Sequence, residues 1–279
     1  MNALKWVRGV NGTLGWIAPQ RVASKKRLAF MTPRSLPLRD WELPLLARAE
    51  RITLRFGLSA LRWGSGPAVL LMHGWEGRPT QFAELIKALV NAGYGVVALD
   101  APAHGRSPGR EANVVLFARA LLEAASELPP LKAVIGHSMG GASALLATQL
   151  GLRTEALVSI AAPSRILTML RRFSHFMGLP RQARAHFVRL VEEQAGIPAG
   201  QLDSAHYQLD FPGLVVHAVD DPMVPFSEAE AIHQSWFDSR LLRLERGGHQ
   251  RVLADPQVVQ AVLTLLASLN QASSKALAS

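Results

Sequence analysis

Serine, aspartate and histidine occur in that order from the middle of the chain onward, each within five residues of the end of a short apolar run. A serine hydroxyl is a weak nucleophile, and it needs a neighbouring base that a third group orients. Ser138, Asp221 and His249 have the residue types and the order that such chemistry requires. We therefore predict that Ser138 is the nucleophile, His249 the general base and Asp221 the acid that orients His249.

The residues around Ser138 fit a nucleophile held in a sharp turn. The motif Gly136-His137-Ser138-Met139-Gly140 follows the apolar run 131–135 and opens a helical stretch. In this strand–turn–helix setting, small residues let the chain pass close to a strained serine, and the helix N-terminus adds N–H donors where an oxyanion forms. Gly136, His137 and Gly140 are predicted to support the turn.

Short apolar runs alternate with helical stretches along most of the chain. Buried strands joined by amphipathic helices favour a mainly parallel, doubly wound α/β sheet. Strand-like 51–63 and the turn Gly64-Ser65-Gly66-Pro67 predict a hairpin that enters this sheet. The predicted strands are 68–72, 95–99, 131–135, 156–160, 214–219 and 241–244, and the predicted helices are 80–91, 112–127, 138–150, 227–236 and 256–269.

This alternation stops between Ala162 and Phe211, where only helical periodicity remains, and we interpret that stretch as an inserted helical lid. Its aromatic residues could line an acyl pocket or pack on the body, and its arginines could attract an anionic acyl donor or form a solvated face. The predicted division is a basic N-terminal extension 1–50, a core 51–162 and 212–270, a lid insertion 163–211 and a frayed tail 271–279.

Four elements, which span residues 68 to 260, together resemble the α/β-hydrolase fold superfamily, in particular its serine esterases and monoacylglycerol-lipase-like enzymes. They are His73-Gly74-Trp75, the loop Asp100 to Ser107, the turn at Ser138, and the loops that carry Asp221 and His249. Their order and their placement at strand ends are more specific than any one of them.

The resemblance implies further roles. The N–H groups of Trp75 and Met139 would form the oxyanion hole, with Gly74 beside them, and His73 would brace the loop. The family pattern of Asp followed by x-x-Val-Pro favours Asp221 over its neighbour Asp220.

The remaining histidines and the absence of cysteine limit other chemistries. With no cysteine, the chain can form neither disulfides nor thiolate metal sites, and no compact His or carboxylate spacing predicts a metal. We expect no metal and no cofactor. His217 lies inside a predicted strand and is expected to be a buried, hydrogen-bonded imidazole.

Charge is concentrated at the N-terminus. The chain has a formal net charge of +9, and residues 1–51 hold ten Lys or Arg against three acids, a net +7. Because the rest is nearly balanced, no nucleic-acid partner is expected. The first 50 residues have two interpretations: an extension whose aromatics pack on the body, or a helix on an anionic membrane, which Gly9, Gly12 and Gly15 disfavour. No apolar run is long enough to span a bilayer, and we expect a cytoplasmic protein, peripheral to a membrane under the second interpretation.

These features predict an enzyme that cleaves carboxylic esters of small molecules with an apolar acyl group through an acyl-enzyme. A thioesterase or an acyltransferase could use the same triad, and a non-catalytic binding protein could share the fold. The sequence leaves the oligomeric state open.

Overall fold

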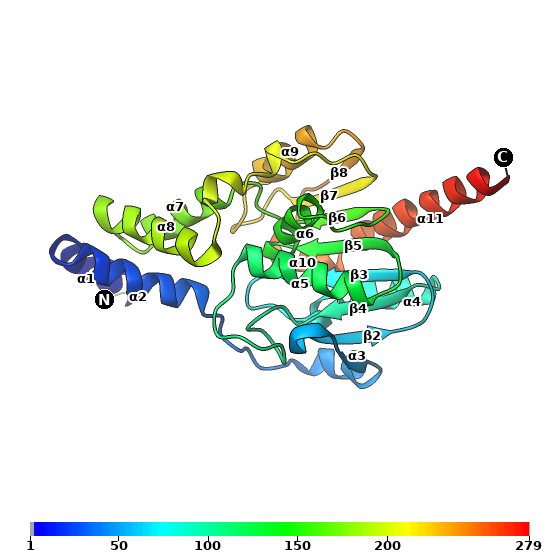
Figure 1. Cartoon of the computed structure of the whole chain (residues 1–279), viewed down its shortest axis with the longest axis horizontal. Helices are drawn as coiled ribbons and strands as arrows, with labels where there is room; N and C mark the ends of the chain where they lie inside the picture. The colour runs from blue at the N-terminus through cyan, green and yellow to red at the C-terminus, as the bar shows by residue number, and fades with distance from the viewer. Residues whose placement is uncertain (1–2, 279) are drawn as a thin grey trace.

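The computed structural model describes residues 3–278, and within them the side chains of residues 4–271. One eight-stranded sheet with the order β1-β2-β4-β3-β5-β6-β7-β8 forms its centre (Figure 1). β1 and β2 form an antiparallel hairpin that turns at residues 54–58 and not at 64–67 as predicted, because β2 pairs antiparallel with β4 instead of β3. The six strands β4, β3, β5, β6, β7 and β8 run parallel to one another. The strands are Glu50–Thr53 (β1), Ser59–Trp63 (β2), Ala68–Met72 (β3), Gly95–Leu99 (β4), Leu131–His137 (β5), Leu157–Ile160 (β6), Gly213–Ala218 (β7) and Ser239–Leu244 (β8).

Apolar side chains on both faces of the sheet explain why the central strands read as continuous apolar runs. Leu70 and Met72 of β3 belong to one buried cluster, whereas Val69 and Leu71 belong to the other. The first cluster includes residues of α5 (Val114–Glu127) and α6 (Met139–Gln149), and the second includes residues of α4 (Ala83–Asn91) and α11 (Pro256–Ala278). The chain therefore has the predicted α/β-hydrolase fold with a doubly wound, mainly parallel sheet.

Shorter helical elements complete the body. They are α3 (Leu43–Ala47), α9 (Phe226–Ser235) and α10 (Gly248–Arg251), with 3-10 turns at Asp40–Glu42, Arg55–Gly57, Pro79–Phe82, Ala199–Gln201, Ser204–His206 and Val252–Ala254.

A helical insertion separates β6 from β7, in the stretch where the sequence predicts one. It contains α7 (Ile166–Phe176) and α8 (Arg181–Ala195). Glu228 of α9, which is buried, fixes the first residues of the insertion. The carboxylate of Glu228 accepts hydrogen bonds from the N–H and hydroxyl groups of Ser164 and from the N–H of Arg165.

Two helices at the N-terminus, α1 (Ala3–Ile17) and α2 (Pro19–Met31), lie beside α7 and α8, and the four helices project from the body as an arm (Figure 1). α1 forms despite Gly9, Gly12 and Gly15. A side chain at position 15 would come within 2.6 Å of the Pro180 ring, so this glycine is a close-packing position. Here tertiary contact outweighs the low helix propensity of glycine.

The first interpretation of the N-terminal segment is wrong for its tryptophans. Trp6 is 60% exposed and Trp16 is 73% exposed, so neither ring packs on the body. The segment packs instead through small residues and through Asn11, which is buried.

The last helix is longer than predicted. α11 continues to Ala278 rather than ending near residue 269. Residues 270–278 include no glycine or proline, so nothing in the local sequence stops the helix.

Within residues 3–278, no single helix is long and apolar enough to cross a membrane. The helical segments Gly248–Ala254 and Pro256–Gln271, which are bent relative to each other, would together be long and apolar enough.

Candidate active site

Ser138 stands in the turn between β5 and α6 with a strained backbone. Its φ of 54° and ψ of −121° are unusual for a residue with a side chain. The N–H of Ser138 donates to the carbonyl of Ile160 on the next strand, at 2.8 Å. Gly140 makes the turn feasible, because a Cβ at that position would collide with the carbonyl oxygens of Met72 and His73.

The structure brings Ser138, His249 and Asp221 together. The Nε2 atom of His249 lies 2.9 Å from the Oγ atom of Ser138, and its Nδ1 atom lies 2.7 Å from Oδ2 of Asp221. Ser138 follows β5, Asp221 follows β7 and His249 follows β8. Because parallel strands end at the same edge of the sheet, side chains far apart in the sequence meet there.

Hydrogen bonds keep Asp221 ionised. Burial alone would raise its pKa, but contacts with His217 and His249 and the N–H of Val224 hold the pKa of this carboxyl well below its usual range. An ionised carboxylate can only accept hydrogen bonds, so Nδ1 of His249 carries the proton. Nε2 is then unprotonated and can accept a hydrogen bond from the hydroxyl group of Ser138.

The two adjacent aspartates have different partners. Asp221 faces His249, whereas Oδ1 of Asp220 accepts the N–H of Gly248 at 2.7 Å. Asp220 thus ties down the loop that carries His249. The carbonyl of His249 accepts a further hydrogen bond from Nε2 of His137, at 2.7 Å. Burial, and then the charge of His249, lower the pKa of His137 to about 4, so His137 is neutral near pH 7.

His217 is the site residue whose contact the sequence does not reveal. It is a buried imidazole, as expected, and its Nε2 atom donates to the carbonyl of Val224 at 2.9 Å. The same atom lies 3.4 Å from Oδ2 of Asp221, the oxygen that faces His249. The one sequence feature that could have indicated this contact is the position of His217, four residues before Asp221 and near the end of an apolar run.

Two backbone N–H groups lie beside Ser138 without a partner in the described part of the chain. One belongs to Met139, the first residue of α6, and the other to Trp75. The Trp75 loop is close, because a Cβ on Gly74 would lie 2.9 Å from Cβ of Ser138, so Gly74 allows the approach.

His73 braces that loop. Its Nε2 atom accepts the N–H of Ala101 at 3.1 Å, and its Nδ1 atom donates to the carbonyl of Gly74 at 2.7 Å. Burial, and then His104, lower the pKa of His73 to about 3. His73 is therefore neutral at ordinary pH and joins the ends of β3 and β4.

Two hollows lie beside the residues that surround Ser138 and Asp221. A narrow apolar pocket of about 30 Å³ is lined by Trp75, Met139 and side chains of the arm. A wider groove of about 450 Å³ is lined by Met223 and Val224, which follow Asp221, and by residues of α7. Phe30 of α2 and Met169 of α7 line both.

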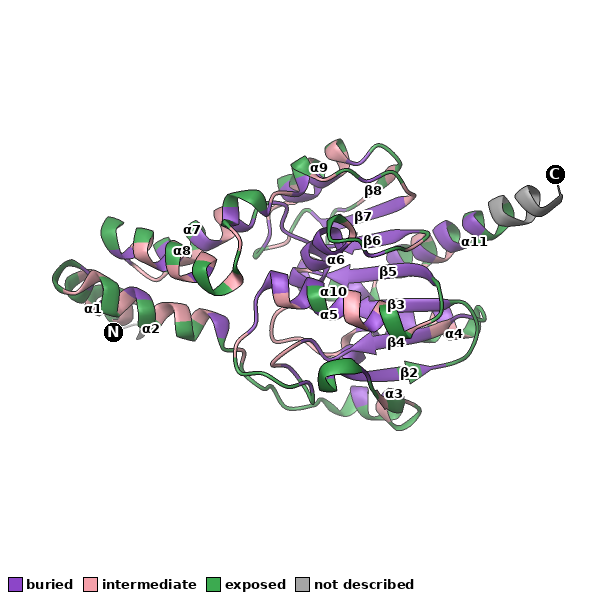
Figure 2. Ribbon diagram, in the orientation of Figure 1, coloured by how far each residue is buried: buried purple, intermediate pink, exposed green. Residues whose placement is uncertain are grey.

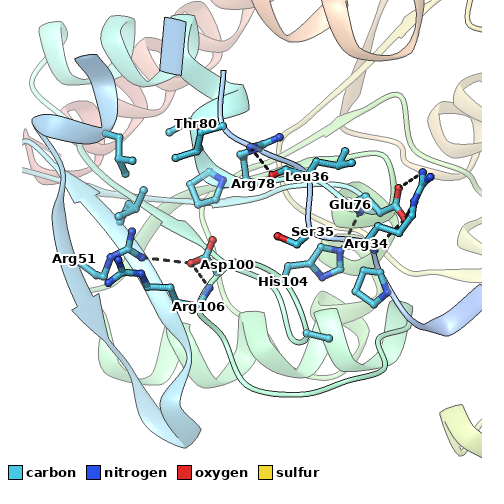
Figure 3. Close-up of a pocket in the computed structure, with 18 residues that line it drawn as sticks. Arg34, Ser35, Leu36, Arg51, Glu76, Arg78, Thr80, Asp100, His104 and Arg106 are labelled. Atoms are coloured by element: carbon cyan, nitrogen blue, oxygen red, sulfur yellow. Dashed lines mark hydrogen bonds and ion pairs between the residues drawn. The ribbon is translucent and has the colours of Figure 1, made fainter. Parts of the chain in front are cut away.

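A third hollow, of about 270 Å³, lies where residues 33–38 cross the loops after β3 and β4 (Figure 3). Most of its charged side chains are already paired. Arg34 binds Glu76 at 2.7 Å, and Arg51 lies 3.5 Å from Asp100. Unlike the narrow pocket, it is lined by neither Trp75 nor Met139, and we regard it as part of the scaffold that holds residue 76.

No group of three or more His, Asp or Glu side chains suited to a metal ion occurs within the part of the chain that the structure describes.

The sequence matches the alpha/beta hydrolase family over residues 69–262. It is 32% identical over 149 residues to the sn-1-specific diacylglycerol lipase ABHD11 of Mus musculus, a match that covers 51% of this chain and 46% of the relative. It is 33% identical over 104 residues to a pimeloyl-[acyl-carrier protein] methyl ester esterase of Xanthomonas campestris pv. campestris, which covers 37% of this chain and 40% of the relative. The chain thus spans less than half the length of these two relatives.

Among solved structures, the fold resembles a serine hydrolase involved in carbazole degradation, with a TM-score of 0.61 and 21% identity over 78% of this chain and 99% of the other. At this identity the resemblance concerns the fold.

Proposed function

Since the chain belongs to the alpha/beta hydrolase family, we propose that it is a serine esterase in which Ser138 attacks the carbonyl carbon of a carboxylic ester. The observation that carries the proposal is the hydrogen-bonded series from Asp221 through His249 to Ser138, with separations of 2.7 and 2.9 Å. A base within hydrogen-bond reach of the hydroxyl is the geometric requirement for activating it.

The first half of the reaction forms an acyl-enzyme. As Oγ of Ser138 bonds to the carbonyl carbon, its proton passes to Nε2 of His249, and the carbonyl oxygen becomes an oxyanion. The N–H groups of Trp75 and Met139 would bind that oxyanion. His249 then gives its proton to the departing alkoxide, which leaves as an alcohol.

The second half releases the acid. A water molecule attacks the acyl carbon, and His249 accepts its proton. The bond to Oγ then breaks, and His249 returns a proton to Ser138 while the carboxylic acid departs. Asp221 remains ionised throughout and fixes the tautomer and orientation of His249.

The narrow pocket next to Trp75 and Met139 is the proposed site of the acyl group. Its walls are mainly apolar and its volume is only about 30 Å³, which favours a short acyl chain. The wider groove would take the rest of the substrate.

Ester hydrolysis with graded chain length tests both points. We expect turnover of p-nitrophenyl acetate and butyrate to exceed that of the decanoate, and His249→Ala to lower it at least about a thousandfold. Met169→Ala, which enlarges the pocket, should shift the preference toward longer chains.

Leu167→Ala, on the same helix but outside both hollows, is the matched control and should keep the wild-type preference. Equal turnover by wild type and His249→Ala would contradict the mechanism. A chain-length profile unchanged by Met169→Ala would contradict the pocket assignment alone.

A thioester with an anionic carrier is the second candidate substrate. Arg165 and Arg172 line the wider groove, and Arg172 forms no ion pair with a described residue. If this candidate is correct, a butyryl thioester of coenzyme A will be hydrolysed faster than p-nitrophenyl butyrate, and Arg172→Ala will lower only the first rate.

A further inference from the structure

The orientation of α1 is fixed by its contacts with the helical insertion. The side-chain amide of Asn11 donates to the carbonyl of Met177 at 2.6 Å. Gly15 lies against the Pro180 ring, and the backbone of Arg8 lies against Gly178. Positions 8, 11 and 15 recur at helical spacing, so one face of α1 is held against the turn between α7 and α8.

The opposite side of α1 is uncovered and carries large apolar side chains beside exposed Gly9 and Thr13. Trp6 and Ile17 are eleven residues apart, close to three helical turns, and they lie on the side away from Asn11. Trp6 is 60% exposed, Trp16 73% and Ile17 76%, and Leu14 beside them is 49% exposed. In Figure 2 much of the ribbon of α1 has the colour of exposed residues. We call Trp6, Leu14, Trp16 and Ile17 the arm face. Several large, exposed apolar side chains on one short helix indicate an interaction surface.

The charges near the arm face are of one sign. Residues 3–31 include six Lys or Arg and no acid. Only Arg27 of these six has an acidic partner, Glu111, among the described residues, whereas Lys5, Arg8 and Lys25 are exposed. Arg171, on the neighbouring helix α7, is exposed as well. Like charges on two copies would repel, which disfavours a second copy of this chain as the partner.

We propose that the arm face binds the surface of an anionic lipid bilayer. Tryptophan side chains suit the boundary between lipid headgroups and acyl chains, and cations beside them attract acidic headgroups. The arm face lines none of the three hollows described above, so it offers no groove in which a peptide could bind. The outer side of a helix fits the flat, deformable surface of a bilayer better.

Docking of the arm face would also bring the wider groove close to the lipid. α2 follows α1 directly, and Phe30 is its second-last residue. The centre of the Phe30 ring lies 4.6 Å from that of Phe173 and 6.4 Å from that of Trp75. An amphiphilic ester in the bilayer would therefore be near the groove. This last step rests on the proposed esterase function, whereas the docking does not.

Flotation of the full chain with vesicles tests the docking. We expect the protein to float with vesicles of equal phosphatidylglycerol and phosphatidylcholine, and to bind pure phosphatidylcholine or high-salt samples much less. The double variant Trp6→Ser/Trp16→Ser should lower the partition coefficient about tenfold or more. Both rings are mainly exposed, so the variant should keep the wild-type melting temperature.

The double variant Trp41→Ser/Phe237→Ser is the matched control. It removes two aromatics of the body that are 52% and 102% exposed, and it should bind vesicles as the wild type does. Absence of wild-type flotation, or equal flotation of the arm-face variant, would overturn the proposal. So would a dimer in solution that dissociates in the arm-face variant. Hydrolysis of soluble p-nitrophenyl acetate should be the same in both double variants, so a failed esterase reaction is told apart from failed docking.

Discussion

At the scale of single residues, three side chains carry the proposed reaction, and a fourth, His217, lies 3.4 Å from the carboxylate of Asp221. Ser138, Asp221 and His249 were identifiable because each follows an apolar run in the order that the fold requires. Periodicity shows only that a strand residue is buried, so the proximity of His217 to Asp221 depends on tertiary geometry. The separate partners of Asp220 and Asp221 likewise follow from the path of the loop.

His217 is predicted to act as a positioning residue. His217→Ala should lower kcat about tenfold with little change in KM, because Asp221 loses a neighbour that helps to orient it. The acidic limb of the pH profile should also move to higher pH, since the contact with His217 helps to hold the pKa of Asp221 low. Steady-state kinetics from pH 5 to 9 measure both.

The exposed His206→Ala variant is the control for His217 and should behave as wild type. A kcat and pH profile equal to those of the wild type in His217→Ala would mean that this contact has no part in catalysis.

The two aspartates provide a second test. Asp221→Asn should reduce kcat about ten-thousandfold, because an amide can donate to Nδ1 and so favour the wrong tautomer of His249. Asp220→Asn keeps an oxygen acceptor for Gly248 and should lose far less. Comparable losses in the two variants would refute the assignment of roles.

At the scale of helices, α1 shows where sequence reasoning about propensity fails. Three glycines weaken a helix in isolation, yet the contact with Pro180 requires a residue without a side chain. The exposed tryptophans could not be anticipated either, because periodicity does not reveal which face a helix turns inward. By contrast, the insertion between β6 and β7 was evident because the alternation stops there.

A pair of glycine substitutions tests the packing of α1. Gly15→Ala should loosen α1, because the new methyl group would lie 2.6 Å from Pro180, and amide hydrogen exchange in residues 4–17 should speed up. Gly9→Ala meets nothing within 4 Å and should stabilise the helix by up to about 1 kcal/mol.

The two exchange rates should therefore move in opposite directions. Slower exchange in Gly15→Ala would show that α1 does not rest on the insertion through this face.

At the scale of the whole molecule, buried neutral histidines couple stability to pH. Burial lowers the pKa of His73 to about 3 and that of His137 to about 4, from an ordinary value of 6.5. Between these values the unfolded chain binds protons that the folded chain does not, so the free energy of unfolding falls as pH decreases. Asp221 and Glu228 have lowered pKa values and act in the same direction below about pH 4.5.

We therefore expect the urea midpoint to fall steadily from pH 6.5 to pH 4. His137→Gln, which removes one titrating group, should show a shallower slope over this range, whereas exposed His206→Gln should not. A midpoint that is constant across this range would contradict the burial of neutral imidazoles.

The central claim is that His249 makes the hydroxyl of Ser138 reactive, and labelling with a fluorophosphonate probe tests it most directly. Mass spectrometry of the labelled, folded protein should find the phosphonyl group on Ser138, with none on Ser138→Ala and much slower labelling of His249→Ala. Failure of the folded wild type to react, or undiminished labelling of Ser138→Ala, would contradict the account.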